Sequence, residues 1–211
     1  MFDERYAALR AAQTAKDDEG EAFDDHVFAC ALSAALADQA ATGLALTEGL
    51  GLTRVETAAL FAARFPLRAA PLCLERAPDP IRAMEEDLLR DLLSSYCAHP
   101  GEQSGWLAAI LARRAMRDDH LWQDLGLFGR GELGRLLQRH FPALHAGNAN
   151  NMRWKKFFYR RICELEGFSL CAAPHCSVCV DFASCFGDED GLSRLATAAR
   201  EAAAGRAASA G

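Results

Sequence analysis

Apolar residues recur at helical spacing along most of the chain, and six segments carry this pattern clearly. These segments are residues 26–41, 53–66, 79–100, 106–116, 131–142 and 151–167. No segment of comparable length alternates apolar and polar residues as a half-buried strand would. The pattern therefore predicts an all-α fold, a helical bundle that carries a cysteine-rich loop on its C-terminal side.

Residues that favour helix ends mark several of the predicted boundaries. The acidic pair Asp24 and Asp25 suits the N-terminus of the first helix, where the helix dipole favours negative charge. Thr53 followed by Glu56 is the sequence pattern of a capping box. The dipeptide 79–80, an aspartate before a proline, predicts the N-cap and first residue of the third helix.

The last of the six helices is expected from about Asn151 to Glu166. Helical spacing places five apolar side chains on one stripe, namely Trp154, Phe157, Phe158, Ile162 and Leu165. Gly167 fits the position that follows a helix end. This helix is therefore expected to anchor the segment that comes after it.

The same pattern divides the chain into three parts. Residues 1–21 are an N-terminal segment that is expected to be helical or frayed, and residues 22–190 are expected to form a single helical domain. That domain includes the cysteine-rich stretch 171–185, which is short and rich in turn-forming residues. Residues 191–211 are an alanine-rich tail.

Composition bounds the class of protein and its compartment. With 211 residues, of which 51% are hydrophobic and 25% charged, the chain can bury a sizeable core without covalent cross-links. It shows neither a secretory signal nor about 18 uninterrupted apolar residues that could span a membrane. The expected location is the cytoplasm, where thiols stay reduced and a cysteine cluster is more often a metal site than a disulfide framework. The net charge of −6 argues against nucleic acid as the principal partner.

Half of the eight cysteines stand within fifteen residues, separated by four, two and five positions. They are Cys171, Cys176, Cys179 and Cys185. The other four are scattered through apolar stretches in which a small buried hydrophobe would serve equally well, namely Cys30, Cys73, Cys97 and Cys163. The clustered thiols are therefore the candidate ligands.

Four converging thiolates suit either tetrahedral zinc or an iron–sulfur cluster, because a thiolate is a soft ligand. Structural zinc sites commonly use two Cys-x2-Cys pairs, whereas only Cys176 and Cys179 form such a pair here. Cys-x4-Cys-x2-Cys instead matches the first three ligands of plant-type ferredoxins. The spacing favours an iron–sulfur cluster over zinc, with redox-active or incidental thiols as the weakest reading.

Histidines and carboxylates add two further candidate ligand positions. His120 and Asp124 are four residues apart, so on a helix they would share a face, as metal ligands or as a hydrogen-bonded pair. His175 lies inside the cysteine stretch, where it can touch the cluster or be exposed. The remaining histidines give no signal of a site.

The four-cysteine pattern, continued as "CFG" and preceded by "NMRWKKFFYRRICELEG", resembles the NifQ family of nitrogen fixation proteins. The resemblance is strong from about Trp106 to Gly187 and extends more weakly back to about Asp24. It implies that the four cysteines bind an iron–sulfur cluster of 3Fe-4S or 4Fe-4S type. It also implies that this cluster captures molybdenum, from molybdate or another source, as a Mo–Fe–S cluster.

The same resemblance implies a molybdenum donor for the iron–molybdenum cofactor of nitrogenase, with the NifEN scaffold and the NifH iron protein as partners. The five basic residues between 153 and 161 are then either a solvated helix face or a positive collar for an anionic cluster and molybdate. No catalytic triad, phosphate-binding loop or dinucleotide fingerprint is legible. The expected function is a carrier and not an enzyme; the alternatives are a zinc-stabilised interaction module and an iron–sulfur electron-transfer protein.

Overall fold

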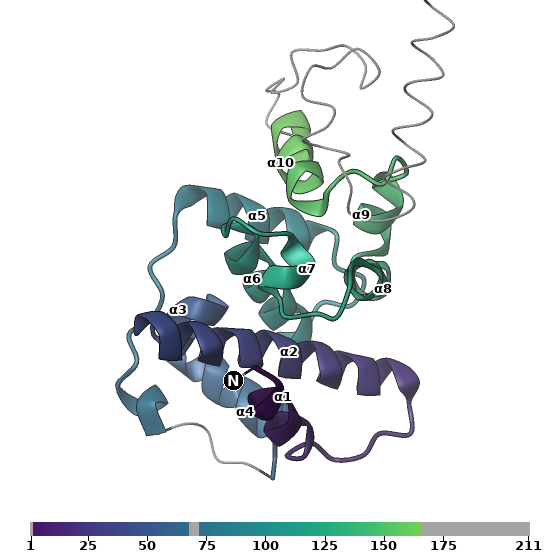
Figure 1. Ribbon diagram of the computed structural model, residues 1–211. Helices are drawn as coiled ribbons and strands as arrows, with labels where there is room; N and C mark the ends of the chain where they lie inside the picture. The colour runs from purple at the N-terminus through teal and green to yellow at the C-terminus, as the bar shows by residue number, and fades with distance from the viewer. Residues whose placement is uncertain (1, 68–71, 166–211) are drawn as a thin grey trace, which may run out of the picture. The chain divides into compact units, whose positions relative to one another are not determined.

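Every secondary-structure element in residues 2–67 and 72–165, the part of the chain that the computed structural model describes, is a helix (Figure 1). The predicted all-α class is confirmed for these residues. None of the described helices combines the length and the apolar composition that a membrane span needs. The elements are α1 (Phe2–Arg10), α2 (Glu19–Thr42), α3 (Leu46–Leu50), α4 (Arg54–Arg64), the 3-10 helix η1 (Leu72–Arg76), α5 (Met84–Ser95), α6 (Glu102–Ala115), α7 (Leu121–Asp124), α8 (Arg130–His140), α9 (Pro142–Gly147) and α10 (Trp154–Leu165).

The chain divides into two compact units, Met1–Pro142 and Ala143–Gly211. The first unit contains α1 to α8, and the second contains α10 and all of α9 except its first residue. The N-terminal segment 1–21, expected to be helical or frayed, contains α1 and the first turn of α2. Leu9 of α1 is fully buried, so this helix belongs to the packed core of the first unit.

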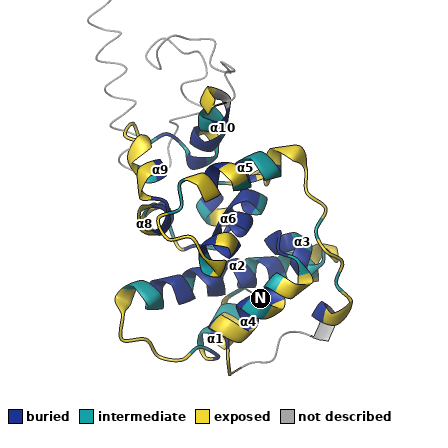
Figure 2. Cartoon of the chain, turned by 180° about the vertical axis from the view of Figure 1, so that it is seen from behind, coloured by how far each residue is buried: buried dark blue, intermediate teal, exposed yellow. Residues whose placement is uncertain are grey.

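The long helix α2 is the centre of the first unit. It lies between α1 and α4 on one side and α6 on the other in both ribbon views (Figures 1 and 2). No residue from Phe23 to Ala35 is exposed, as expected for a helix that is apolar nearly all round. Phe28 is completely buried, and its ring meets the edge of Trp106 of α6 with the centroids 6.3 Å apart.

The start of α2 corrects the prediction from the acidic pair. Asp18 is the N-cap, and its carboxylate accepts a hydrogen bond from the backbone N–H of Glu21 at 2.7 Å. Asp24 and Asp25 therefore lie inside the helix and are buried. Acidic residues recur from position 17 to 25, so local composition could not single out the one that caps the helix.

The capping box predicted for α4 is confirmed. The N–H of Glu56 donates to Thr53 Oγ1 at 3.2 Å, and the N–H of Thr53 donates to Glu56 Oε2 at 2.8 Å. Asp79, by contrast, does not cap α5, which begins at Met84. The Asp79 carboxylate accepts from the N–H of Arg54 at 2.8 Å and so supports the first turn of α4 instead.

In the second unit, a side-chain-stabilised turn precedes α10. The Asn148 side chain donates to the carbonyl of Met152 and accepts from its N–H, both at 2.8 Å. Asn151 adopts a left-handed conformation with φ of 52°, which asparagine tolerates better than most residues. This turn places the start of α10 at Trp154, three residues after the predicted start.

Candidate functional site

The four clustered cysteines lie outside the residues that the structure describes, as does His175 within the same stretch. Their grouping around a metal therefore stays a prediction. It is supported by the chemistry of the donor set, because four thiolates close together in sequence suit soft metal ions and iron–sulfur clusters.

Helix α10 is the last described element before the cysteine stretch in sequence, and it ends at Leu165, six positions before Cys171. Most of the predicted apolar stripe is buried (Figure 2), namely Trp154, Phe157, Phe158 and Ile162. Leu165, the last member of the stripe, is 59% exposed. Helical spacing keeps Leu165 on the same side of α10, but among the described residues the buried part of the stripe ends one turn earlier.

Five basic residues lie in α10 or directly before it, namely Arg153, Lys155, Lys156, Arg160 and Arg161. Helical spacing places Arg161 beside Phe157 and Leu165 of the apolar stripe, so the five do not share one face. Arg160 Nε lies 2.9 Å from Glu164 Oε1, and Arg161 Nη1 lies 2.5 Å from Glu164 Oε2. The hydrogen bond from Arg160, followed by that from Arg161, holds the pKa of Glu164 below its usual value.

His120 and Asp124 mark the two ends of α7. The N–H of Asp124 donates to the carbonyl of His120 at 3.0 Å, so the expected spacing of one helical turn is present in the backbone. His120 itself is the N-cap, with an extended ψ of 141°. The Asp124 carboxylate is buried and lies 3.6 Å from Arg117 Nε. Asp124 thus forms part of an ion pair with a neighbouring arginine.

A polar cluster that the sequence did not reveal surrounds His26 of α2. The Tyr6 hydroxyl is 2.8 Å from His26 Nδ1, and Glu132 Oε2 of α8 is 3.1 Å from His26 Nε2. Cys30, one turn further along α2, places its Sγ 3.7 Å from the imidazole nitrogens. Burial raises the pKa of the Cys30 thiol to about 12, and the Glu132 charge adds to the rise. This thiol is therefore protonated and poorly reactive.

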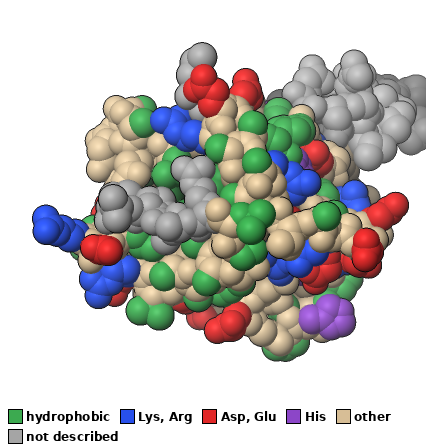
Figure 3. All heavy atoms as spheres, turned by 90° about the horizontal axis from the view of Figure 1, so that it is seen from below, with side chains coloured by type: hydrophobic (Ala, Val, Ile, Leu, Met, Phe, Trp, Pro, Cys, Tyr) green, Lys and Arg blue, Asp and Glu red, His purple; other side chains and the backbone are tan. Residues whose placement is uncertain are grey.

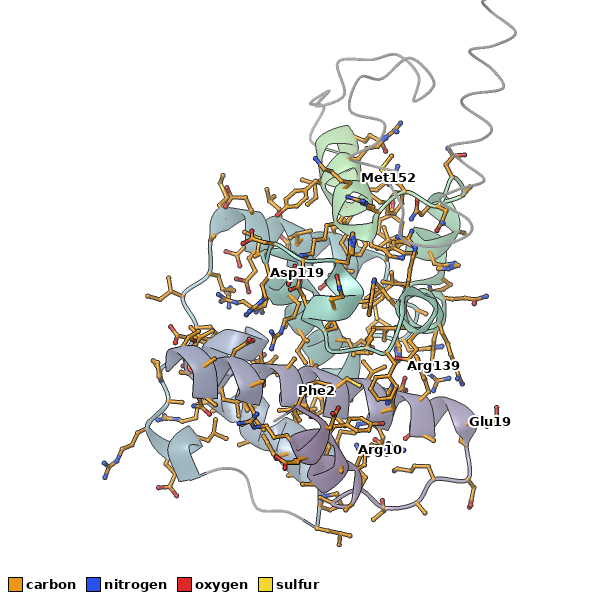
Figure 4. All side chains as sticks on the ribbon, viewed as in Figure 1. Phe2, Arg10, Glu19, Asp119, Arg139 and Met152 are labelled. Atoms are coloured by element: carbon orange, nitrogen blue, oxygen red, sulfur yellow. The ribbon has the colours of Figure 1, made fainter. Side chains whose placement is uncertain are left out.

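A second buried network joins α2, α6 and α8. Asp24 Oδ1 lies 2.7 Å from His140 Nε2, while Arg139 and Gln103 donate to the same carboxylate at 3.1 Å and 2.8 Å. Arg139 extends from α8 toward α2 (Figure 4). Burial alone would raise the pKa of Asp24, but the hydrogen bond and charge of His140, with Arg139 and Gln103, hold it below its usual value.

Asp25, the next residue, faces a different partner. Arg64 of α4 donates to Asp25 Oδ1 at 3.1 Å and to Glu21 at 3.3 Å, and it also contacts Gln103. Here burial outweighs the arginine, so the pKa of Asp25 is raised. The partners of Asp24 and Asp25 therefore connect α2 to three other helices of the first unit.

The sequence alone does not pair these polar groups, because His26 and Asp24 meet partners more than 100 residues away along the chain. The signal was nevertheless present, since Asp24, Asp25 and His26 interrupt an otherwise apolar helix, and a buried polar group requires a partner. Within residues 2–67 and 72–165, no group of three or more His, Cys, Asp or Glu side chains is arranged to hold a metal ion. The networks around Asp24 and His26 join helices to one another.

The described residues form an all-helical framework, and four closely spaced cysteines follow it in sequence. Together these features define a class of small helical proteins with a cysteine-rich C-terminal motif. The chain belongs to the NifQ family, whose family model matches residues 27–187 and therefore includes all four cysteines. Membership gives the protein a role in nitrogen fixation.

Named relatives agree with this assignment. Protein NifQ homolog of Sinorhizobium fredii is 49% identical over 81% of this chain and 75% of its own length. Protein NifQ of Rhodobacter capsulatus is 42% identical over 70% of this chain and 82% of its own length. Protein NifQ of Klebsiella pneumoniae is 38% identical over 57% and 73% respectively. These names state no enzymatic activity. No solved structure matches the chain significantly.

Proposed function

We propose that this protein is an iron–sulfur protein that captures molybdenum and donates it to assembly of the iron–molybdenum cofactor of nitrogenase. One observation carries the proposal: the family match spans the whole Cys-x4-Cys-x2-Cys-x5-Cys motif, so the four thiols belong to the matched region. A donor of this kind is a carrier that acts in the cytoplasm and need not be an enzyme.

The donor set fits the cofactor that the family implies. Cys171, Cys176, Cys179 and Cys185 supply four soft thiolates, which suits an iron–sulfur cluster of 3Fe-4S or 4Fe-4S type. When bound, such a cluster supplies sulfide ligands and electrons, both of which molybdenum needs if it arrives as the oxyanion molybdate. Three of the thiolates would hold iron and the fourth the incoming molybdenum. The recipients implied by the family resemblance are the NifEN scaffold and the NifH iron protein.

Alanine substitution of the cysteines tests this proposal. Replacing any one of the four motif cysteines, for example Cys176→Ala or Cys179→Ala, should abolish molybdenum transfer, because each thiolate is a ligand. The matched controls are Cys30→Ala and Cys97→Ala, which remove thiols outside the motif and should affect stability at most. Cys30 is buried with a protonated thiol, and Cys97 is half-buried. Iron and molybdenum contents are measured in each anaerobically purified variant, together with transfer into cofactor synthesis.

The outcomes separate this function from its alternatives. At least one motif variant is expected to retain iron yet lose molybdenum, because three thiolates suffice for a three-iron cluster. A colourless protein containing only zinc would support an interaction module instead. Iron without molybdenum in the unaltered protein would favour electron transfer. Normal molybdenum content and transfer in Cys176→Ala or Cys179→Ala would exclude the assigned site.

A further inference from the structure

Helix α1 is held on the first unit by one stripe of side chains. Phe2, Tyr6 and Leu9 are spaced at i, i+4 and i+7, so they share one side of the helix. Leu9 is fully buried, whereas Phe2 and Tyr6 are half-buried. The opposite side of α1 is exposed (Figure 2), and its residues are Asp3, Glu4, Ala7 and Ala8. Three anchors on one side therefore seat α1, while its other side faces solvent.

Each aromatic anchor of α1 meets a distinct feature of the surface beneath it. The Phe2 ring lies against Gly126, where an added Cβ would come within 2.7 Å of the ring. The Tyr6 ring meets Phe128 at an angle of 66°, with the centroids 5.3 Å apart. Phe128 is itself 61% exposed, so this contact lies at the protein surface. Docking of a helix through apolar anchors at this spacing is a recurring mode of recognition between proteins.

A hydrogen-bond relay adds a polar requirement at the middle anchor. The Tyr6 hydroxyl is 2.8 Å from His26 Nδ1, and Glu132 Oε2 is 3.1 Å from His26 Nε2. Because a carboxylate can only accept, a neutral His26 donates from Nε2 and accepts the Tyr6 hydroxyl proton at Nδ1. A helix with a hydroxyl at this anchor therefore satisfies His26, and one with phenylalanine does not. We call the four residues beneath the aromatic anchors the α1 seat, namely His26, Gly126, Phe128 and Glu132.

The seat and α1 differ in their relation to the family. Gly126, Phe128 and Glu132 lie within the matched residues 27–187, whereas all of α1 precedes them. With nine residues, α1 is shorter than the roughly 12–15 residues that an isolated helix needs in water, so it depends on its seat to stay helical. Residues 14–18, which lead from α1 to α2, are exposed. Helix α1 can therefore leave its seat without displacing α2.

Aromatic contacts, and not charge, distinguish this seat from other parts of the surface. The two acidic residues of α1 point away from the seat, since Asp3 and Glu4 are exposed. On the face shown in Figure 3, acidic and basic side chains are interspersed among hydrophobic ones, so that face offers no extended area of one charge. A partner for the seat is therefore defined by its apolar anchors.

We propose that α1 is a displaceable strap, which covers its seat until an amphipathic helix of a partner protein takes its place. The partner helix carries an aromatic residue, a tyrosine and a leucine at i, i+4 and i+7, because these are the side chains that the seat accepts from α1. The inference goes beyond the proposed donor function. It concerns the first unit alone, and the cysteine motif belongs to the second.

Native-state hydrogen exchange of the full-length protein tests whether α1 leaves its seat. The amides of α1 should exchange at least about 100-fold faster than those of residues 28–32 in α2, because a local opening costs less than global unfolding. Low concentrations of urea should barely change the α1 rates, since such an opening exposes little surface. Equal protection of α1 and α2 would overturn the strap, because α1 would then open only when the whole unit unfolds.

A synthetic peptide of residues 2–13 tests whether the seat accepts a helix from another molecule. The fluorescently labelled peptide is titrated with full-length protein, and binding is followed by anisotropy. Leu9→Ala in the protein should raise its affinity for the peptide at least about tenfold, since a weakened strap leaves the seat open more often. The matched control is Leu165→Ala, which removes an exposed leucine of α10 and should bind the peptide as the unaltered protein does. Circular dichroism checks that both variants stay folded.

The Tyr6 hydroxyl gives a second test that does not depend on loss of packing. In Tyr6→Phe protein, His26 Nδ1 loses the hydroxyl that faces it. The unaltered peptide restores this hydroxyl, so it should bind the variant several-fold more tightly than a peptide that carries Tyr6→Phe. Equal binding of the two peptides would exclude the relay as part of the seat.

The remaining outcomes separate this inference from its alternatives and from the proposed function. Equal peptide binding by the Leu9→Ala and Leu165→Ala proteins would overturn the displaceable strap. Dimers formed by the Leu9→Ala protein without peptide, detected by sedimentation, would assign the seat to α1 of a second copy and exclude the partner helix. Neither exchange nor peptide binding involves metal, so failure of molybdenum transfer would refute the donor function and leave the strap intact.

Discussion

Two adjacent carboxyl groups on α2 have pKa values shifted in opposite directions. The pKa of Asp24 is lowered because His140, Arg139 and Gln103 together overcome the effect of burial. The pKa of Asp25 is raised because burial dominates over its contact with Arg64. Since both residues start from the same ordinary value of 3.8, the difference arises wholly from their surroundings.

These opposite shifts predict opposite dependences of stability on pH. With a folded pKa below 3.8, Asp24 contributes stability that is fully present above that value and is lost as the pH falls through its folded pKa. With a folded pKa above 3.8, Asp25 makes a contribution that is present at low pH and is lost as the pH rises through its folded pKa. Asp24→Asn should therefore reduce the loss of stability as the pH falls below 3.8. Asp25→Asn should reduce the loss of stability as the pH rises above 3.8.

At neutral pH, Asp24→Asn should also lower the free energy of unfolding by about 2 kcal/mol, the typical cost of losing hydrogen bonds to a buried charged group. The free energy of unfolding is measured by urea denaturation between pH 3 and 7 for the unaltered protein and both variants. A steeper acid loss in Asp24→Asn than in the unaltered protein would contradict the assigned direction of the Asp24 shift.

At the scale of elements, a single glycine controls how closely α1 approaches its neighbours. Gly126 follows α7 with φ of +71°, a conformation that side chains disfavour. A Cβ at this position would lie 2.7 Å from the ring of Phe2 and 2.9 Å from the carbonyl oxygen of Cys30. Phe2 is at the start of α1 (Figure 4). The absence of a side chain at residue 126 thus lets α1 pack against this turn.

We predict that Gly126→Ala destabilises the protein by at least about 1–2 kcal/mol, the usual cost of a left-handed conformation for an L-residue. The added clash should also loosen α1, which is detected as faster hydrogen exchange of its amides. The control is Gly131→Ala in α8, where a Cβ meets nothing within 4 Å. Gly131 is exposed in the first turn of α8, so that change should leave the free energy of unfolding within about 0.5 kcal/mol of the unaltered protein. Equal effects of the two substitutions would refute the role of Gly126.

Local signals predicted some elements well and others poorly. The capping box of α4 was predictable because Thr53 and Glu56 are three residues apart and satisfy one another. Asp79 carries an equally good local signal, yet its partner is the N–H of Arg54, which lies 25 residues away in sequence. A cap that serves another helix cannot be recognised from neighbouring residues alone.

The same distinction applies to the candidate site. The cysteine motif could be found from sequence because its ligands lie within fifteen residues and their spacing is informative. Glu132 meets His26 across 106 residues, and His140 meets Asp24 across 116. Such pairs depend on how the helices pack, and no periodic pattern along one chain specifies the partner.

At the scale of the molecule, the first unit has its own means of staying folded. Its core includes fully buried Phe28, Phe61 and Phe141, drawn from three different helices or their ends. The Asp24 and His26 networks then join α2 to α8. None of these interactions involves the cysteine motif, which belongs to the second unit by sequence.

Removing bound metal should therefore leave the first unit folded. Because burial of apolar side chains stabilises residues 2–67 and 72–142 directly, chelation in air should preserve most of the helical circular dichroism and a cooperative thermal transition. Phe28→Ala is the comparison that shows the assay responds to this core, since it should cost about 3–5 kcal/mol and lower the transition temperature with or without metal. Loss of helix on chelation alone, as severe as that caused by Phe28→Ala, would mean that the metal site stabilises the core itself.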